Sequence, residues 1–185
     1  DGVKTVNRMV NILWNVYRFP LPYMILDGFT PKERENGTWD QGEILHLHSR
    51  LLDEDRWILS RINTVAWEIE EAMQQCQLHR ATRSLSSFVL EDLSRWYIQL
   101  IRPRMWLEED AEEKEQAYSS VYYVLRRLML LLSPFCPYLA EKMYQNFRLS
   151  KDPESVHLQD WVSPDERMFD PVLEWVLALE GRSET

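Results

Sequence analysis

The sequence predicts an all-α fold: an antiparallel bundle of four or five helices with a short C-terminal appendage. The chain has only five glycines in 185 residues, and long stretches lack proline, so it is poor in the turn residues that β-hairpins need. Apolar residues recur at steps of three and four over long segments, as they do along one side of an α-helix. Helices of roughly 20 residues that are joined by short links pack antiparallel.

The first predicted helix runs from the N-terminus to about Pro20. Its apolar side is formed by six residues at helical spacing: Val3, Val6, Val10, Leu13, Trp14 and Tyr17. Residues 28–52 follow, with Pro31 and three glycines among charged residues and with no sustained apolar period. We predict that residues 28–52 form a long surface connection, with room for one short helix.

Three further long helices and a shorter one complete the predicted bundle. Asp53 caps the second helix, whose buried side is Ile58, Ile62, Val65, Ile69, Met73 and Cys76. The third helix runs from about Leu78 to Arg102 and is stopped by Pro103, with an inward side of Ala81, Leu85, Phe88, Val89, Trp96 and Leu100. The fourth helix has the inward residues Ala117, Val121, Val124, Leu125, Leu128 and Leu132, and a shorter helix ends near Phe147. We assign the bundle to residues 1–151 and an acidic appendage with a short helix to residues 152–185.

Composition argues against export and membrane insertion. The longest apolar run, Leu128 to Leu132, is far too short to span a bilayer, and the N-terminus has no apolar core like that of a signal peptide. The two cysteines, Cys76 and Cys136, lie far apart on apolar helical faces, where thiols are usually buried. These features predict a cytoplasmic protein with reduced thiols.

The net charge of −9 is unevenly distributed. Residues 152–185 hold nine acids against two arginines, so most of the negative excess lies in the appendage. Residues 77–107 hold five arginines against two acids, and the first eighteen residues hold Lys4, Arg8 and Arg18 against Asp1. These two basic zones keep a nucleic-acid partner open, because affinity for phosphates comes mainly from Lys and Arg.

The polar side of the first helix is a candidate nucleic-acid surface. Its residues share one side at helical spacing and are followed by an aromatic ring: Lys4, Arg8, Asn11, Asn15, Arg18 and then Phe19. Cations suit phosphates, amides suit base edges, and an aromatic ring suits base stacking. A merely solvated face fits the spacing equally well, and Phe19 is as compatible with the core as with a ligand.

The second basic zone offers arginines rather than aromatics as binding candidates. Arg95, Gln99 and Arg102 share a helical face, and Arg104 follows the proline. Guanidinium groups bind phosphate oxygens through two parallel hydrogen bonds. The neighbouring large aromatics, Trp96, Tyr97 and Trp106, are more often core residues than stacking platforms.

No pattern of catalytic residues stands out. The chain has no G-x-S-x-G, P-loop or C-x-x-C sequence, so we expect no catalytic residues. Two E-x-x-H pairs, Glu43 with His46 and Glu154 with His157, have the ligand spacing of di-iron bundles. Both pairs fall outside the clear helices, and the buried sides of the second and fourth predicted helices carry no carboxylates, so we expect no metal site. A helical scaffold that binds proteins remains the alternative from another class.

Five segments in order carry a family resemblance: ILWNVYRF, DRWILSRI, FVLEDLSRWYIQLIRPRMW, SPFCPYLAEKMYQNF and SVHLQDW. Together they resemble the class I aminoacyl-tRNA synthetases for isoleucine, valine and leucine, from about Val3 to Trp161. They look most like isoleucine enzymes of archaeal and eukaryotic type, with valine enzymes as the alternative. The resemblance implies a helical bundle that receives the anticodon stem and loop of tRNA, directly after a catalytic Rossmann domain.

The resemblance also implies what lies outside this chain. The family's HIGH and KMSKS signatures, which hold ATP, are absent here, so aminoacylation with ATP and magnesium is expected in a preceding catalytic domain of the same chain. The expected partners are tRNA and that domain, and we expect a monomer. Asn15 and Phe19 match the family's WN-x-x-RF segment, which faces anticodon bases in valine-type relatives. Arg95, Arg102 and Arg104 match its S-x-WYI-x-x-x-R-x-R segment, for which we expect general backbone contacts.

Overall fold

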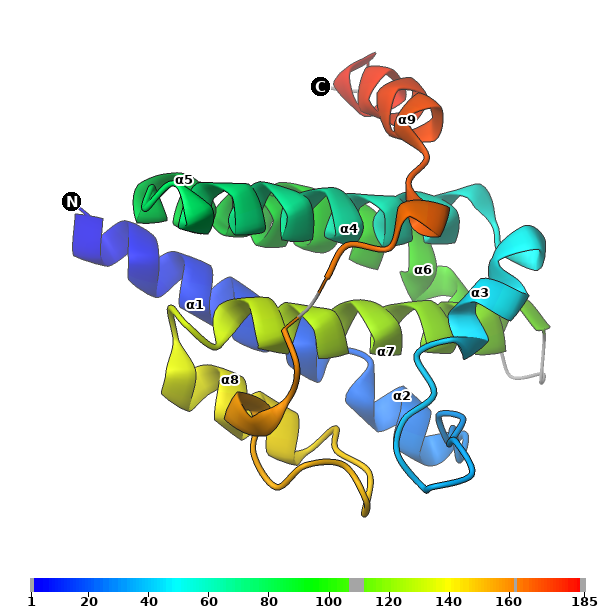
Figure 1. The fold of residues 1–185 in the computed structure, drawn as a ribbon. Coiled ribbons are helices and arrows are strands. Elements are labelled where there is room, and N and C mark those ends of the chain that lie inside the picture. The colour runs from blue at the N-terminus through cyan, green and yellow to red at the C-terminus, as the bar shows by residue number, and fades with distance from the viewer. Residues whose placement is uncertain (1, 107–111, 162, 184–185) are drawn as a thin grey trace.

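The structure, a computed structural model, describes residues 2–106, 112–161 and 163–183, but not the side chains of residues 2, 3, 5 and 179–183. Its long elements form a helical bundle (Figure 1): α1 (Gly2–Arg18), α4 (Asp53–Gln74), α7 (Glu112–Leu132) and the continuous rod of α5 (Leu78–Ser87), η2 (Phe88–Tyr97) and α6 (Ile98–Met105). The predicted all-α fold is confirmed. Within the described ranges no residue belongs to a strand, and one antiparallel bridge joins Glu33 to Trp39.

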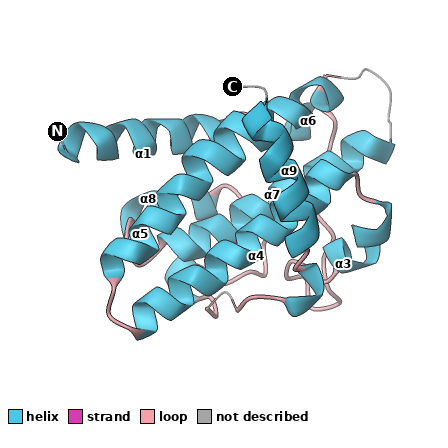
Figure 2. Cartoon of the chain, turned by 90° about the horizontal axis from the view of Figure 1, so that it is seen from above, coloured by secondary structure: helices cyan, strands magenta, loops and turns pink. Residues whose placement is uncertain are grey.

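Shorter helices decorate the long ones: α2 (Leu21–Leu26), α3 (Glu43–Leu47), η1 (His48–Arg50), α8 (Pro137–Gln145), η3 (Val156–Leu158), η4 (Glu166–Met168) and α9 (Pro171–Ser183). Helix α4 packs against α5, η2, α7 and α9, and α7 packs against α6 and α8. Helix α1 packs against η2 and lies along one edge of the bundle when seen from above (Figure 2). The fold therefore leaves one long side of α1 open.

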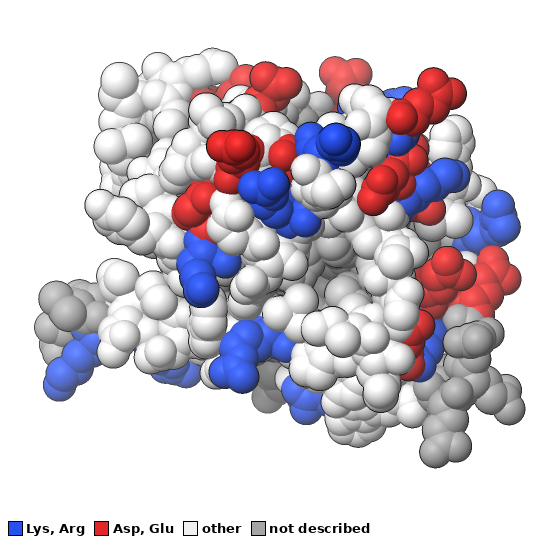
Figure 3. All heavy atoms as spheres, turned by 90° about the horizontal axis from the view of Figure 1, so that it is seen from below, with Lys and Arg blue, Asp and Glu red and all other residues white. Residues whose placement is uncertain are grey.

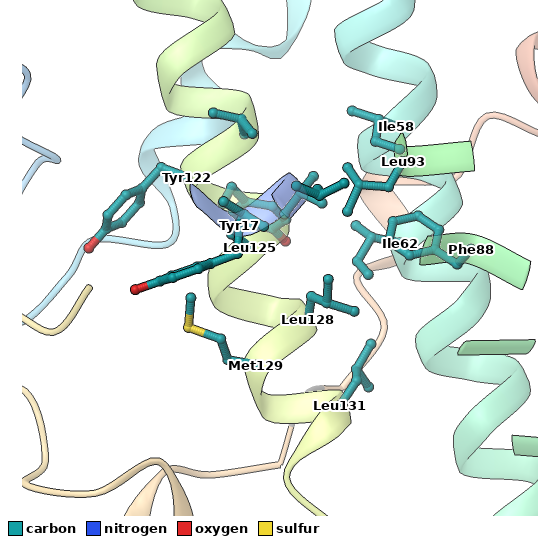
Figure 4. Packing of buried hydrophobic residues seen from close by; sticks show 14 of the residues in the cluster. Tyr17, Ile58, Ile62, Phe88, Leu93, Tyr122, Leu125, Leu128, Met129 and Leu131 are labelled. Carbon is teal, nitrogen blue, oxygen red and sulfur yellow. The ribbon is translucent and has the colours of Figure 1, made fainter. Parts of the chain in front are cut away.

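The core lies between α4, η2, α1 and α7 (Figure 4). Buried side chains meet there from all four elements, among them Ile58, Ile62, Phe88, Leu93, Tyr17, Leu125 and Leu128. Burying one such side chain stabilises the fold by roughly 1.5–3 kcal/mol. Every inward residue that the sequence predicts for α7 is buried, because an uninterrupted α-helix keeps the 3.6-residue period.

The predicted inward side of α4 is confirmed only as far as Ile69. Met73 is half-buried, and Cys76 is exposed. The prediction for Cys76 was wrong because α4 ends at Gln74 and Cys76 takes a positive φ of 55° in the turn to α5. Cys136 is also a free thiol, and its partial burial raises its pKa.

The third predicted helix contains a register change. Residues Phe88–Tyr97 form a π-helix, and the buried residues along the whole rod step by four: Ala81, Leu85, Val89, Leu93, Tyr97, Ile101 and Met105. The wider π-turn accommodates this step, whereas an α-helix would rotate the stripe away from the core. As a result Leu100 is 39% exposed, so its predicted inward position was wrong, whereas Trp96 is half-buried and packs against the core. Pro103 does not stop the rod, since α6 continues to Met105.

The amino-terminal turns of α1 also depart from the prediction. Val6 is 61% exposed, although its spacing placed it on the buried side, and Lys4, Asn7 and Arg8 are exposed around it. No described element covers this part of α1, so apolar and polar sides are equally open to solvent. The side chain of Val3, also predicted on the apolar side, lies outside the described residues.

Residues 28–52 contribute to the core as well as to the surface. Short helix α3 lies within them, and Trp39, Ile44 and Leu51 are buried. The ring of Trp39 packs edge-on against Tyr122 and Tyr123 of α7, with centroids 5.6 and 5.8 Å away. The segment has no helical period because isolated side chains, rather than a continuous face, reach the core.

The described part of the acidic segment 152–185 packs against the bundle. Val156 and Met168 are buried in the core. Asp170 pairs with Arg56 of α4 at 2.9 Å, and Glu174 of α9 pairs with Arg61 at 3.0 Å. Several of its acidic side chains therefore neutralise arginines of the bundle.

We expect Glu174→Gln to loosen α9 selectively. Glu174 accepts hydrogen bonds from Ser60, Thr64 and Arg61, all on α4. Hydrogen bonds to charged groups contribute about 1.5–3 kcal/mol each, less where solvent screens them. Amide hydrogen exchange should accelerate in α9 and stay unchanged in α7. Equal acceleration throughout the chain, or the same effect from exposed Glu35→Gln, would contradict this local role.

None of the helices described combines the length and the apolar character that crossing a bilayer requires.

Candidate nucleic-acid interface

The polar side of α1 forms one open stripe, which we call the α1 polar face: Lys4, Arg8, Asn11, Asn15 and Arg18. All five side chains are exposed, as their steps of three and four predict. Arg18 lies in the last turn of α1, where the helix dipole favours a cation. Among the described residues, no carboxylate lies within ion-pair distance of Lys4, Arg8 or Arg18, so their charges are available to an external anion.

A groove of about 750 Å³ opens beside the carboxyl end of the α1 polar face. We call it the α1–α6 groove, and its walls come from α1, α2, η2 and α6: Ile12, Asn15, Val16, Arg18, Phe19, Leu21, Pro22, Tyr23, Ile25, Ser94, Ile98, Gln99 and Arg102. Apolar side chains form much of the lining, and amide, hydroxyl and guanidinium groups lie among them. A site of this kind accepts a flat, partly polar group such as a base.

Phe19 and Arg102 are in contact within the groove. The guanidinium carbon of Arg102 lies 5.2 Å from the centroid of the Phe19 ring, which suits a cation–π interaction. The Phe19 ring also lies 5.6 Å from that of Tyr23, whose hydroxyl accepts a hydrogen bond from Trp106 Nε1 at 2.8 Å. Phe19 is half-buried, so it both packs against the core and lines the groove.

Arg102 has unused hydrogen-bonding capacity. Its Nε is buried and has no hydrogen-bond partner within the described ranges. A buried N–H without a partner costs about 1–3 kcal/mol. The Arg102 side chain lines the groove, so its guanidinium charge lies beside any anion that enters it.

Arg104 is not part of this surface, and its assignment as a binding residue was wrong. It is 7% exposed and pairs with Asp55 at 2.7 Å and with Glu54 at 3.2 Å. It also donates to the Glu113 carbonyl at 2.6 Å. Because the rod follows a four-residue step and continues past Pro103, position 104 turns toward α4 instead of toward solvent.

Asp55 is the buried carboxylate that pairs with Arg104. Its carboxyl group is fully buried and also accepts a hydrogen bond from Tyr97 Oη at 2.8 Å. Burial raises the pKa of Asp55, and the hydrogen bond and charge of Arg104 oppose that rise. Burial, together with the Asp55 charge, raises the pKa of Tyr97 well above its ordinary value. The three side chains form a structural ion-pair network.

Arg95 remains exposed, but it pairs with Glu91 one helical turn away at 2.5 Å. An exposed pair of this kind contributes little to stability, and an RNA phosphate can compete for the arginine. Its side chain does not line the α1–α6 groove.

The sequence missed Tyr23 and Ser94 as lining residues, and it placed Gln99 on the face of Arg102 without assigning it a role. Gln99 carried a signal, because it shares a helical face with Arg102 at a step of three. Tyr23 carried none, since its place in the groove depends on how α2 turns back against α6.

Charge is segregated on the underside of the molecule (Figure 3). Among the residues that the structure describes, the Lys and Arg side chains toward the amino-terminal end of α1 have no acidic neighbours in this view, whereas elsewhere on this face acidic and basic side chains are mixed. A one-sided cationic strip attracts a polyanion even on a protein with negative net charge.

The E-x-x-H pairs do not form a metal centre. Among the described residues, no group of three or more His, Cys, Asp or Glu side chains is placed to hold a metal ion. Glu43 instead accepts a hydrogen bond from the Lys32 amide at 3.3 Å, and burial raises its pKa.

Known proteins that are similar to this chain identify its family. A family model described as the anticodon-binding domain of tRNA ligase matches residues 55–181. Isoleucine–tRNA ligases from Methanoculleus marisnigri and Methanoregula boonei are both 56% identical to the chain, over 174 and 180 residues, which are 94% and 97% of it. The enzyme from Methanosarcina barkeri is 51% identical over 177 residues. The chain spans about 16% of the length of these relatives. It belongs to the family of anticodon-binding domains of tRNA ligases.

Proposed function

We propose that this chain binds the anticodon stem and loop of a tRNA and works as part of an isoleucine–tRNA ligase. The observation that carries the proposal is the α1–α6 groove, which joins Asn15, Arg18, Phe19 and Arg102 at the carboxyl end of the α1 polar face. Family membership and the relatives named isoleucine–tRNA ligase support it. Those names favour isoleucine over valine as the amino acid of the whole enzyme.

In the proposed binding mode the α1 polar face and the α1–α6 groove bind different parts of the tRNA. Lys4, Arg8 and Arg18 contact phosphates of the stem, which carry no sequence information. Loop bases enter the groove, because unpaired bases are readable whereas the A-form major groove is too narrow for side chains. Asn15 and Gln99 offer amides to base edges, and Phe19 with Arg102 offers a surface for stacking.

We assign the chemical reaction of the whole enzyme to a different domain. Joining isoleucine to tRNA with ATP and magnesium requires a catalytic domain, which we propose for the same protein in the cytoplasm. This chain contributes recognition and orientation of the tRNA rather than reacting groups.

Arg18→Gln tests the proposal directly. We expect tRNA affinity at moderate salt to fall by roughly tenfold, about 1.4 kcal/mol, as for loss of one charged hydrogen bond. The dependence of log K on log salt should also become shallower, by about 0.7–0.9. Fluorescence anisotropy with an isoleucine tRNA transcript over a salt series measures both quantities.

Arg83→Gln is the matched control. Arg83 is also exposed on a helix, has no ion pair among the described residues, and lies on α5 outside the groove. We expect its tRNA affinity to stay at the wild-type value. If the two variants bind tRNA equally well, the proposed surface is wrong.

A further inference from the structure

A second cavity, of about 470 Å³, lies against α7. Its lining includes Arg34, Trp39, Arg126, Arg127, Gln159 and Trp161, and we call it the α7 cavity. In Figure 1 α1 passes behind α7. The α7 cavity shares no lining residue with the α1–α6 groove.

Two buried arginines on successive positions of α7 reach this cavity, and the first is neutralised. Arg126 is 4% exposed and pairs with Asp152 at 2.8 Å. It also donates to the Phe147 carbonyl at 3.0 Å, and its guanidinium lies 4.9 Å from the Trp39 ring centroid. Asp152 is itself occupied, because it accepts bonds from the amides of Trp39 and Leu149. Arg126 and Asp152 therefore form a closed structural unit.

Arg127 is buried without such a partner. It is 5% exposed and donates to two neutral oxygens, Asn63 Oδ1 at 3.0 Å and the Ser163 carbonyl at 2.9 Å. Its Nε is buried and unbonded, and within the described ranges no carboxylate lies within 4.0 Å of it. Burial lowers the pKa of Arg127, and its interactions with Tyr123 and Asp165 oppose that shift. Its guanidinium lies 5.3 Å from the centroid of the neutral Tyr123 ring.

An unpaired buried guanidinium indicates a missing anion. Taking a cation out of water costs several kcal/mol unless an opposite charge compensates it. The acids that line the cavity do not compensate: Asp152 is engaged by Arg126, and Asp160 is exposed to solvent. Arg34 lines the same cavity and adds a further positive charge, only loosely paired with Asp40 at 3.7 Å.

The remaining lining suits a flat ring with polar edges. Trp161 is 39% exposed, which leaves part of its indole free for stacking. Gln41, Gln159 and Asn36 add amides to the wall. The volume lies within the range of about 300–1,000 Å³ that is typical of small-molecule sites.

We propose that the α7 cavity binds a nucleotide, with its phosphate on Arg127 and its base against Trp161. Arg127 supplies a buried guanidinium charge that has no carboxylate partner among the described residues, and the neighbouring amides meet the polar edge of the base. The shared chemistry is a phosphorylated nucleoside, either a free mononucleotide or one residue of an RNA strand. The site is separate from the proposed anticodon groove and does not depend on it.

The test uses three probes on the 185-residue protein: inorganic phosphate, adenosine monophosphate and a short single-stranded oligoribonucleotide. Nitrogen-15 NMR follows the Nε–H signal of Arg127, which should shift with adenosine monophosphate and with the oligonucleotide. A response to the oligonucleotide but not to the mononucleotide assigns the phosphate to an RNA strand. A response to inorganic phosphate alone, or to none of the probes, overturns the proposal.

Trp161→Ala separates binding from folding, because its side chain is partly exposed. We expect nucleotide affinity to fall by about 5- to 150-fold, the loss of one base stack. Trp175→Ala is the matched control, since Trp175 is 65% exposed on α9 and does not line the cavity. Equal nucleotide affinity in the two variants would refute the stacking position. Arg18→Gln should leave mononucleotide binding unchanged, so failure of the anticodon surface and failure of this site are distinguishable.

Discussion

Replacing Arg104 with methionine is expected to lower the free energy of unfolding by roughly 3–5 kcal/mol, the cost of removing one partner from a buried ion pair. Among the described residues, the change leaves the Tyr97 hydroxyl as the one hydrogen-bond partner of the fully buried Asp55 carboxyl. It also removes the donor to the Glu113 carbonyl. Urea denaturation followed by circular dichroism measures the loss, which is a large fraction of a typical domain's stability.

Two further variants test the cause of this loss. Arg83→Met, at an exposed arginine without an ion pair among the described residues, should change the stability by less than about 0.5 kcal/mol. The double change Asp55→Leu with Arg104→Met should be less destabilising than Arg104→Met alone, because no charge stays buried. If the double variant is the less stable one, packing of the Arg104 stem rather than charge explains the effect.

The loss of stability caused by Arg104→Met should also depend on pH, in a defined direction. Burial raises the pKa of Asp55 in the folded state, and loss of Arg104 raises it further. A raised carboxyl pKa contributes stability that is fully present below the unfolded pKa and is lost as pH rises through the folded pKa. The destabilisation by Arg104→Met should therefore be smaller near pH 4, about the ordinary Asp value, than at pH 7.

Replacing Phe19 with alanine is expected to weaken tRNA binding by about 1–3 kcal/mol, a 5- to 150-fold rise in Kd. The ring is half-buried in the groove, with Arg102 above it at 5.2 Å. Removing it takes away a base-stacking surface and the support that positions the Arg102 guanidinium. Anisotropy titration with tRNA at fixed salt gives the affinity, and the thermal unfolding midpoint reports whether the fold persists.

Phe19→Tyr and Tyr138→Ala complete this test. Tyrosine keeps the aromatic face, so Phe19→Tyr should retain most of the affinity. Tyr138 is 91% exposed on α8 and is not among the groove residues, so its removal should leave tRNA binding unchanged. A folded Phe19→Ala protein with wild-type affinity would remove base stacking from the proposed mechanism.

The α1 polar face was predictable because helical spacing alone places its residues on one side. Lys4, Arg8, Asn11, Asn15 and Arg18 are exposed together, as predicted. The sequence did not predict that the carboxyl end of this face lies beside Arg102. That arrangement requires α1 to pack against η2, and it requires the rod of α5, η2 and α6 to keep its register through the π-helix. A strict step of four from Ala81 to Met105 was the available signal for that register.

Sequence by itself determined the helical class, the inward side of α7 and the open polar side of α1, because each depends only on the period of a regular helix and on the scarcity of turn residues. Tertiary structure alone decided which arginines of α6 and α7 are buried. Arg104 is a binding candidate in the sequence, yet packing buries it beside Asp55. The same packing buries Arg127 of α7 beside neutral oxygens. The reason is physical: a residue's exposure and the pairing of its charge depend on the neighbouring elements, which local periodicity does not encode.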